Sequence, residues 1–252
     1  MAGVCLAHGG FIRWHQFQGE ALFEQVTHRA SQDVEDPSLD QVRAAASHYE
    51  AINDRAWIDY PLAEERWAVM RAMEGALEAQ AGRAQMALGA YSAALGAHPD
   101  PGGVHLSMGE LLAGMDQFPR AIDHLRAAVH YHPTSAAAHY NLAVLVAHGG
   151  DTEEGIAHLT KAAKLDPDDA EIQNNLGFLL AGEGHVRQAE EHLQRAIELD
   201  SSFAIPYLNL GLLVWAQGRS DEARELLRRG LELAPGAVPM LEKAGYPLEN
   251  LR

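Results

Sequence analysis

The sequence contains little cysteine, few positive charges and no long apolar run. Its one cysteine, Cys5, cannot form an internal disulfide and offers no metal-binding spacing. No segment approaches the roughly eighteen apolar residues that a membrane-spanning helix needs. The start, "MAGVCLAHGGFIRWH", lacks the basic and apolar stretches of a secretory signal. These absences predict a soluble protein of a reducing compartment, the cytoplasm.

Positive charge is scarce: 19 Lys and Arg stand against 35 Asp and Glu, a net charge of -16. Such a surface repels nucleic acid phosphates and anionic membranes, so we expect neither as a partner. A basic or neutral protein partner is favoured. Aromatic residues make up 7% of the chain and hydrophobic residues 47%, which indicates a folded core of mostly small aliphatic side chains.

The sequence does have an internal repeat with a period of 34 residues. The aligned positions are Leu142, Leu176 and Leu210; Gly109, Gly177 and Gly211; Gly82, Gly150, Gly184 and Gly218; Ala87, Ala121, Gly155, Ala189 and Ala223; Tyr91, Leu125, Leu159, Leu193 and Leu227; and Ala94, Ala128, Ala162, Ala196 and Gly230. Each copy ends with a proline except one, which has Ser201 instead; the prolines are Pro99, Pro133, Pro167 and Pro235.

These columns resemble the tetratricopeptide repeat, whose pattern is a large residue, Leu-Gly, an aromatic or large apolar residue, Ala, an aromatic, Ala and a closing Pro. The copies lie at 68–101, 102–135, 136–169, 170–203 and 204–237, and the first is degenerate because Glu74 replaces the usual Leu. The resemblance covers about two thirds of the chain. It implies an all-α fold, a right-handed α-solenoid of stacked antiparallel helix hairpins.

The residue spacing predicts two helices in each copy. In 204–237, Tyr207, Leu210 and Val214 share one helical face, and Ala223, Leu227 and Gly230 share the facing one. Small residues on the contact line let the two helix axes approach closely. Glycine marks the turn between the helices, and proline ends the second helix. Since one hairpin cannot bury both of its faces, the hairpins are expected to stack.

The two ends of the chain depart from the period. Residues 1–67 show helical spacing at about 19–31 and 37–57, with Asp36 and Pro37 as the expected cap and first turn of the second helix. We interpret 1–67 as an irregular helical N-terminal cap, followed by a new helix at Pro61. Residues 238–252 begin like another copy but are broken by Gly245 and Pro247, so they form a truncated C-terminal cap.

No pattern supports catalysis, a cofactor or a metal site. The glycine-rich stretch "AGEGH" at 181–185 has no preceding strand, and equivalent glycines recur at the same turn of other copies. We therefore interpret it as a helix end and not as a phosphate site. His124, His158 and His192 recur 34 residues apart, which we interpret as a packed or solvated column with metal binding as the minor alternative. The protein is expected not to be an enzyme.

The concave surface offers a candidate binding site. In each first helix, residues one, two and five places after the large core residue are expected to line the groove, and one turn along lie Ala181 and Trp215. The candidate peptide-binding residues are Tyr140, Asn141, Val144, Asn174, Asn175, Phe178, Leu208, Asn209, Leu212 and Trp215. Their apolar members would form an exposed patch of the kind that usually has a partner.

Asn141, Asn175 and Asn209 form a ladder within that surface. A carboxamide offers a donor and an acceptor, so it can pair with a peptide unit of any sequence, and the tetratricopeptide family uses such asparagines in this way. The alternative is that they only bond a neighbouring helix. The groove columns hold no Lys or Arg, which disfavours a clamp for a C-terminal carboxylate.

We therefore expect a non-catalytic interaction scaffold that binds a partner's peptide segment in the groove. The alternative is a self-assembling structural protein, whose groove is filled by another copy or by its own "FIRWHQF" at 11–17.

Overall fold

The computed structural model describes residues 18–27, 37–55 and 61–248, and these are helical with short connections. Residues 18–27 form a helix. It is followed by α2 (Leu39–Arg55), α3 (Pro61–Gln80), α4 (Ala84–Ala94), α5 (Pro101–Ala113), α6 (Phe118–Tyr131), α7 (Ala136–His148), α8 (Thr152–Leu165), α9 (Ala170–Gly182), α10 (Val186–Leu199), α11 (Ala204–Ala216), α12 (Ser220–Leu233), the 3-10 helix η1 (Pro235–Ala237) and α13 (Val238–Lys243). Within the described ranges there is no strand, so the expected all-α fold is confirmed.

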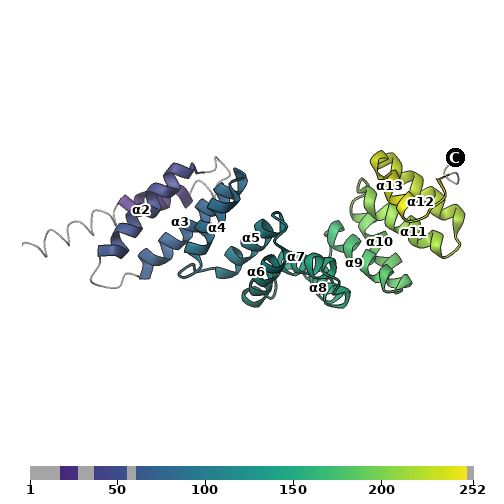
Figure 1. The fold of residues 1–252 in the computed structure, drawn as a ribbon, viewed down its shortest axis with the longest axis horizontal. Coiled ribbons are helices and arrows are strands. Elements are labelled where there is room, and N and C mark those ends of the chain that lie inside the picture. Colours follow the sequence, from purple (N-terminus) through teal and green to yellow (C-terminus); the bar gives the residue numbers. More distant parts are fainter. Residues whose placement is uncertain (1–17, 28–36, 56–60, 249–252) are drawn as a thin grey trace, which may run out of the picture. The chain divides into compact units, whose positions relative to one another are not determined.

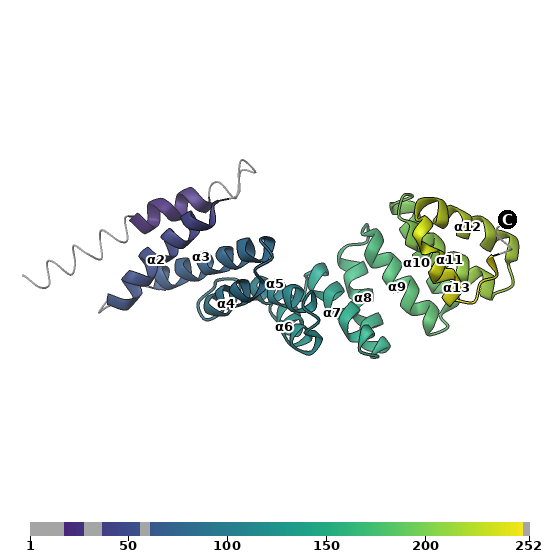
Figure 2. The ribbon, with the colours of Figure 1, turned by 45° about the horizontal axis from the view of Figure 1, so that its top comes forward.

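The helices pack as consecutive antiparallel hairpins, which Figures 1 and 2 show as paired ribbons. The described residues divide between His132 and Pro133 into two compact parts, here called the N-terminal body and the C-terminal body. In the N-terminal body α2 packs on α3, α3 on α4, and α5 on α6. In the C-terminal body the hairpins are α7–α8, α9–α10 and α11–α12, and α8 packs on α9 and α10 on α11. No helix in the described ranges is long and apolar enough to cross a membrane.

The turn between the helices of a hairpin needs a left-handed backbone, as the sequence predicted. Gly82, Gly150, Gly184 and Gly218 have φ between 73° and 98°. Asp116 occupies the equivalent position of α5–α6 with φ 58°. A residue with a Cβ atom pays a steric cost in this region that glycine avoids.

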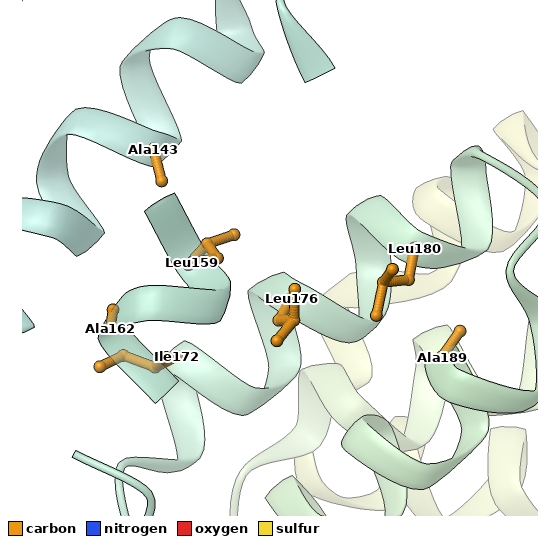
Figure 3. Close-up of a cluster of buried hydrophobic side chains, with 7 residues drawn as sticks. All are labelled: Ala143, Leu159, Ala162, Ile172, Leu176, Leu180 and Ala189. Carbon is orange, nitrogen blue, oxygen red and sulfur yellow. The ribbon is translucent and has the colours of Figure 1, made fainter. Parts of the chain in front are cut away.

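The core of the C-terminal body is built from the repeated small and aliphatic positions. One cluster joins α7, α8, α9 and α10 and contains Ala143, Leu159, Ala162, Ile172, Leu176, Leu180 and Ala189 (Figure 3). The glycine column lies at the closest helix contact, since a Cβ atom on Gly177 would stand 2.7 Å from Leu193 Cγ. Small residues therefore set the distance between the two helices of each hairpin.

The N-terminal body begins with three helices that share one core. Val26 of the first helix, Val42 of α2 and Met70 of α3 are fully buried together. The helix expected at 19–31 is present at 18–27, and the remainder of that range lies outside the described residues. Asp36, the expected cap of α2, lies outside the described residues, and Pro37, expected in its first turn, precedes the helix. Helix α2 begins at Leu39, with reciprocal bonds between Ser38 and Gln41, because a hydroxyl and an amide three residues apart satisfy two backbone N–H groups.

Glu74 occupies the position where a repeat usually has Leu, and in the N-terminal body its carboxylate forms ion pairs with arginines. Arg43 of α2 donates from Nε to Glu74 Oε1 at 2.7 Å and from Nη2 to Glu78 Oε1 at 2.6 Å. Arg71 also pairs with Glu74, and Arg83 with Glu78. The Glu78 side chain is only 1% exposed. Since an unpaired buried carboxylate is strongly destabilising, these arginines are what make the two buried glutamates tolerable.

The C-terminal segment packs as an additional short helix on the last hairpin. Leu241 of α13 and Tyr246 are buried against Leu208 of α11 and Leu227 of α12. Gly245 has φ 78°, which ends the helix at the break that the sequence predicted. Helix α13 thus covers the face of α11 that a further hairpin would otherwise cover.

Candidate functional site

The C-terminal body contains two neighbouring apolar hollows, here called the small hollow and the large hollow. The small hollow, of about 270 Å³, is lined by Val144, Ala147, His148, Leu159, Asn175, Phe178 and Leu179. The large hollow, of about 720 Å³, is lined by Ala147, Thr152, Phe178, Leu179, Ala181, Gly182, Glu183, Leu193, Asn209, Leu212, Leu213, Met240, Lys243 and Ala244. Three residues, Ala147, Phe178 and Leu179, line both hollows and therefore lie between them.

Five of the ten candidate peptide-binding residues line these hollows: Val144 of α7, Asn175 and Phe178 of α9, and Asn209 and Leu212 of α11. They come from equivalent positions of successive first helices, so the 34-residue period places them along one surface. Phe178 is 55% exposed and Val144 is 39% exposed. Large apolar side chains at such exposure are available for contact with a ligand.

Two other expected groove residues are not at the surface, and the expectation of exposure is wrong for them. Asn174 is 3% exposed and Leu208 is 0% exposed. The position directly after the large core residue faces the first helix of the following hairpin. Asn174 therefore contacts Asn209 of α11, and Leu208 packs against Leu241 of α13.

Trp215 was expected to be an exposed anchor one turn along, and it lines neither hollow. Its ring is half-buried and meets Tyr246 edge to face, with ring centroids 5.3 Å apart at 72°. Edge-to-face geometry stabilises aromatic pairs. Trp215 therefore holds the C-terminal segment on α11.

Tyr140 and Asn141 of α7 are half-buried. Burial, with the nearby Glu171 and Asp169 carboxylates, raises the pKa of Tyr140 to about 12. The hydroxyl is therefore neutral at physiological pH. It serves as a hydrogen-bonding group and not as a charge.

The asparagines bond across neighbouring hairpins. Asn175 Nδ2 donates to the Tyr140 hydroxyl at 2.9 Å, and Asn209 Nδ2 donates to Asn174 Oδ1 at 2.9 Å. Asn174 Nδ2 in turn donates to Asn175 Oδ1 at 3.2 Å. The asparagines thus bond a neighbouring helix, which was the alternative to peptide binding. Their partners there are side chains and not the helix backbone. Each carboxamide has a second N–H and further acceptor capacity, so a bond to a ligand is not precluded.

The C-terminal helix contributes lining residues that were not predicted. Met240, Lys243 and Ala244 close one side of the large hollow. The sequence did indicate the start of a further copy at 238. A helix at that position packs where the first helix of another hairpin would lie. Leu179 and Leu213, each directly after a predicted groove residue, were missed as well.

Charge at the site is sparse and nearly balanced. Glu183 and Lys243 are the charged side chains of the large hollow, and His148 is the titratable side chain of the small one. Within the described ranges, no group of three or more His, Cys, Asp or Glu side chains is arranged to hold a metal ion. The arrangement is suited to holding apolar side chains beside a few hydrogen-bonding groups.

Comparison with known proteins identifies the repeat independently. A family model described as tetratricopeptide repeat matches residues 106–170 and 174–238. No curated protein matches this chain.

Solved structures with the same arrangement of helices include MamA, at 26% identity with a TM-score of 0.59, over 68% of this chain and 97% of that one. YrrB, described as a TPR protein with an unusual peptide-binding site, is similar at 19% identity and a TM-score of 0.65, over 79% of this chain and 99% of its own. PilF of Pseudomonas aeruginosa is similar at 14% identity and a TM-score of 0.69, over 92% and 99%. The last two similarities concern the fold alone.

Proposed function

This chain belongs to the tetratricopeptide repeat family, and from that premise we propose that it is a non-catalytic scaffold that binds a peptide segment of a partner protein in the groove of its C-terminal body. The observation that carries the proposal is Phe178, which is 55% exposed between two apolar hollows. A large exposed aromatic flanked by apolar concavities is costly in water and is stabilised by a ligand that covers it.

The geometry favours a ligand with apolar side chains on both sides of Phe178. The large hollow has room for a bulky side chain and the small hollow for a compact one. Asn175 and Asn209 lie in the walls of the small and the large hollow respectively, so their remaining hydrogen-bonding capacity is available to a peptide backbone. Specificity would then come mainly from apolar contacts.

The charge of the chain favours a basic or neutral ligand. With a net charge of -16, long-range attraction speeds the approach of a basic segment, and salt weakens that attraction. The balanced pair of charges at the large hollow, Glu183 and Lys243, gives no preference of its own. The single cysteine in the sequence supports a cytoplasmic location as part of this proposal.

Selection from a phage-displayed random peptide library tests the proposal. We expect enrichment of peptides with two apolar residues at a fixed spacing and with basic flanks. Failure to enrich any sequence would contradict peptide binding. Light scattering over a range of concentrations tests the alternative, since self-assembly through the groove predicts a mass that increases with concentration. The candidate internal occupant, 11–17, lies outside the described residues.

A further inference from the structure

Three hairpins contain the same hydrogen bond between their two helices, and histidine provides one side of it each time. His105 Nδ1 lies 2.9 Å from His124 Nδ1, His139 Nδ1 lies 2.8 Å from His158 Nδ1, and Gln173 Oε1 lies 2.7 Å from His192 Nδ1. The histidine column 124, 158 and 192 therefore bonds within each hairpin. Two hairpins, α5–α6 and α7–α8, have an imidazole pair, whereas α9–α10 has a glutamine and a histidine.

Gln173 determines the direction of the bond in its hairpin. Its Nε2 donates to the carbonyl of Pro167 at 3.1 Å, because a carbonyl can only accept. The amide oxygen is then the atom that faces His192, and it too can only accept. His192 Nδ1 must therefore carry a hydrogen.

His139 occupies the position of Gln173 and makes the same two contacts. Its Nε2 lies 3.2 Å from the carbonyl of Pro133, so Nε2 carries the hydrogen. A neutral imidazole has one hydrogen only, so His139 Nδ1 accepts. His158 Nδ1 is the donor, as His192 Nδ1 is in the next hairpin.

This direction decides what protonation does. A proton added to His158 enters at Nε2, which lies 3.8 Å from the Glu154 carboxylate, and the bond to His139 survives. A second proton on the pair must enter at His139 Nδ1, where it removes the acceptor and sets two positive rings against each other. His139 is 6% exposed, so solvent screens that repulsion poorly. Gln173 cannot take up a proton, so its bond to His192 persists at any physiological pH.

We propose that the imidazole pairs make α5–α6 and α7–α8 open on acidification, while α9–α10, held by Gln173 and His192, keeps its contact. The chain thus contains two hairpins with an imidazole pair and a matched hairpin, α9–α10, that is less sensitive to acid because only His192 of its pair can take up a proton. Opening of α7–α8 displaces Val144, which lines the small hollow, and Tyr140, which bonds Asn175. Acid therefore also weakens peptide binding in the proposed groove.

The surroundings agree with the sign of this effect. Burial lowers the pKa of His105 and His124, and for His124 the charges of His105 and Arg120 add to the lowering while Asp123 opposes it. A base whose folded pKa lies below its unfolded value of about 6.5 binds fewer protons when folded. Its contribution to stability is therefore complete above that pH and is lost as the pH falls below it.

Among the helices packed around these pairs, α4, α9 and α11 carry few charged groups, whereas α3 carries Glu64, Glu65 and Arg66 in addition to its arginine-paired glutamates. The Tyr131 ring stacks on His105 with centroids 5.9 Å apart. Helices α4 and α11 carry no acidic or basic residue, α9 carries Glu171, and the buried Glu74 and Glu78 of α3 are paired with arginines. Burial lowers the pKa of His192 as well, and the Glu191 carboxylate partly opposes that lowering.

Amide hydrogen exchange at neutral and mildly acidic pH, corrected for intrinsic rates, tests the proposal on three chains: the native one, His139→Gln and Gln173→His. In the native chain we expect acid to reduce the protection of α7 and α8 to a greater extent than that of α9 and α10. His139→Gln should remove this difference. Gln173→His should transfer acid sensitivity to α9 and α10.

Equal responses of the two hairpins, or responses that neither substitution changes, would overturn the proposal. If His139→Gln does not fold, Gln173→His decides alone, because it adds an acid-sensitive pair without removing one. Nitrogen-15 NMR of the imidazoles provides a second decision. At neutral pH His158 and His192 should carry hydrogen on Nδ1 and His139 on Nε2, and a hydrogen on Nδ1 of neutral His139 would contradict the mechanism.

Discussion

The side-chain amide of Asn175 donates a hydrogen bond to the hydroxyl of Tyr140 at 2.9 Å and so joins the first helices of two successive hairpins. Asn209 and Asn174 make the corresponding bond one hairpin later. The asparagine ladder therefore stabilises the stacking of hairpins along the same surface that contains the hollows. Stacking and recognition use the same side chains, and each can be measured separately.

A double-mutant cycle on Tyr140→Phe and Asn175→Ala should show a coupling free energy of about 0.5–1.5 kcal/mol in the free energy of unfolding, the usual worth of such a bond. Tyr140→Phe removes only the hydroxyl, so packing is retained. Denaturant unfolding provides the measurement. Tyr140→Phe combined with Gly182→Ala is the control, and its two effects should add, since nothing lies within 4 Å of a Cβ atom on Gly182. Additivity in the first pair would show that the bond contributes nothing.

Gly177→Ala should destabilise the C-terminal body by about 1–3 kcal/mol, the typical cost of overpacking. The added Cβ atom would stand 2.7 Å from Leu193 Cγ and 3.1 Å from the carbonyl oxygen of Ala189. Gly182→Ala in the same helix is the matched control, since nothing lies within 4 Å of its Cβ position. That change should be neutral or stabilising by up to about 1 kcal/mol, because alanine favours helix. Equal thermal shifts for both variants would refute the close contact.

Asp116→Gly should stabilise the N-terminal body by about 1 kcal/mol, since residues with a Cβ atom are strained in the left-handed region. Asp116 is exposed and has φ 58°. Asp123→Gly in the middle of α6 is the control. There glycine should cost about 1 kcal/mol because it weakens the helix. A lower melting temperature for Asp116→Gly would mean that the aspartate stabilises the turn in another way.

Much of the fold was predictable because each repeated position has a local physical reason. Gly150 and Gly184 adopt the left-handed turn, and Gly177 lies at the close contact with Leu193, as their spacing indicated. The 34-residue period also placed Val144, Phe178 and Leu212 on one surface.

What the sequence could not provide is which neighbour covers a given position. Asn174 and Leu208 share a helical face with exposed residues, but the following helix buries them. Trp215 is covered by Tyr246, which lies beyond the last regular repeat. The partners of the histidine column are found 19 residues earlier in the chain, and only the antiparallel packing of the hairpin brings them into contact. These contacts depend on tertiary packing, which residue spacing alone does not determine.

The most direct test of the central claim is the dissociation constant of a library-selected peptide, measured by calorimetry on the native chain, on Phe178→Ala and on Ile205→Ala. Ile205 is an exposed apolar residue of α11 that lines neither hollow, so it controls for general loss of apolar surface. The account predicts that Phe178→Ala weakens binding by about 2 kcal/mol, roughly 30-fold, with an unchanged melting temperature, while Ile205→Ala leaves the dissociation constant unchanged. Equal affinities for all three chains would contradict the groove as the binding site.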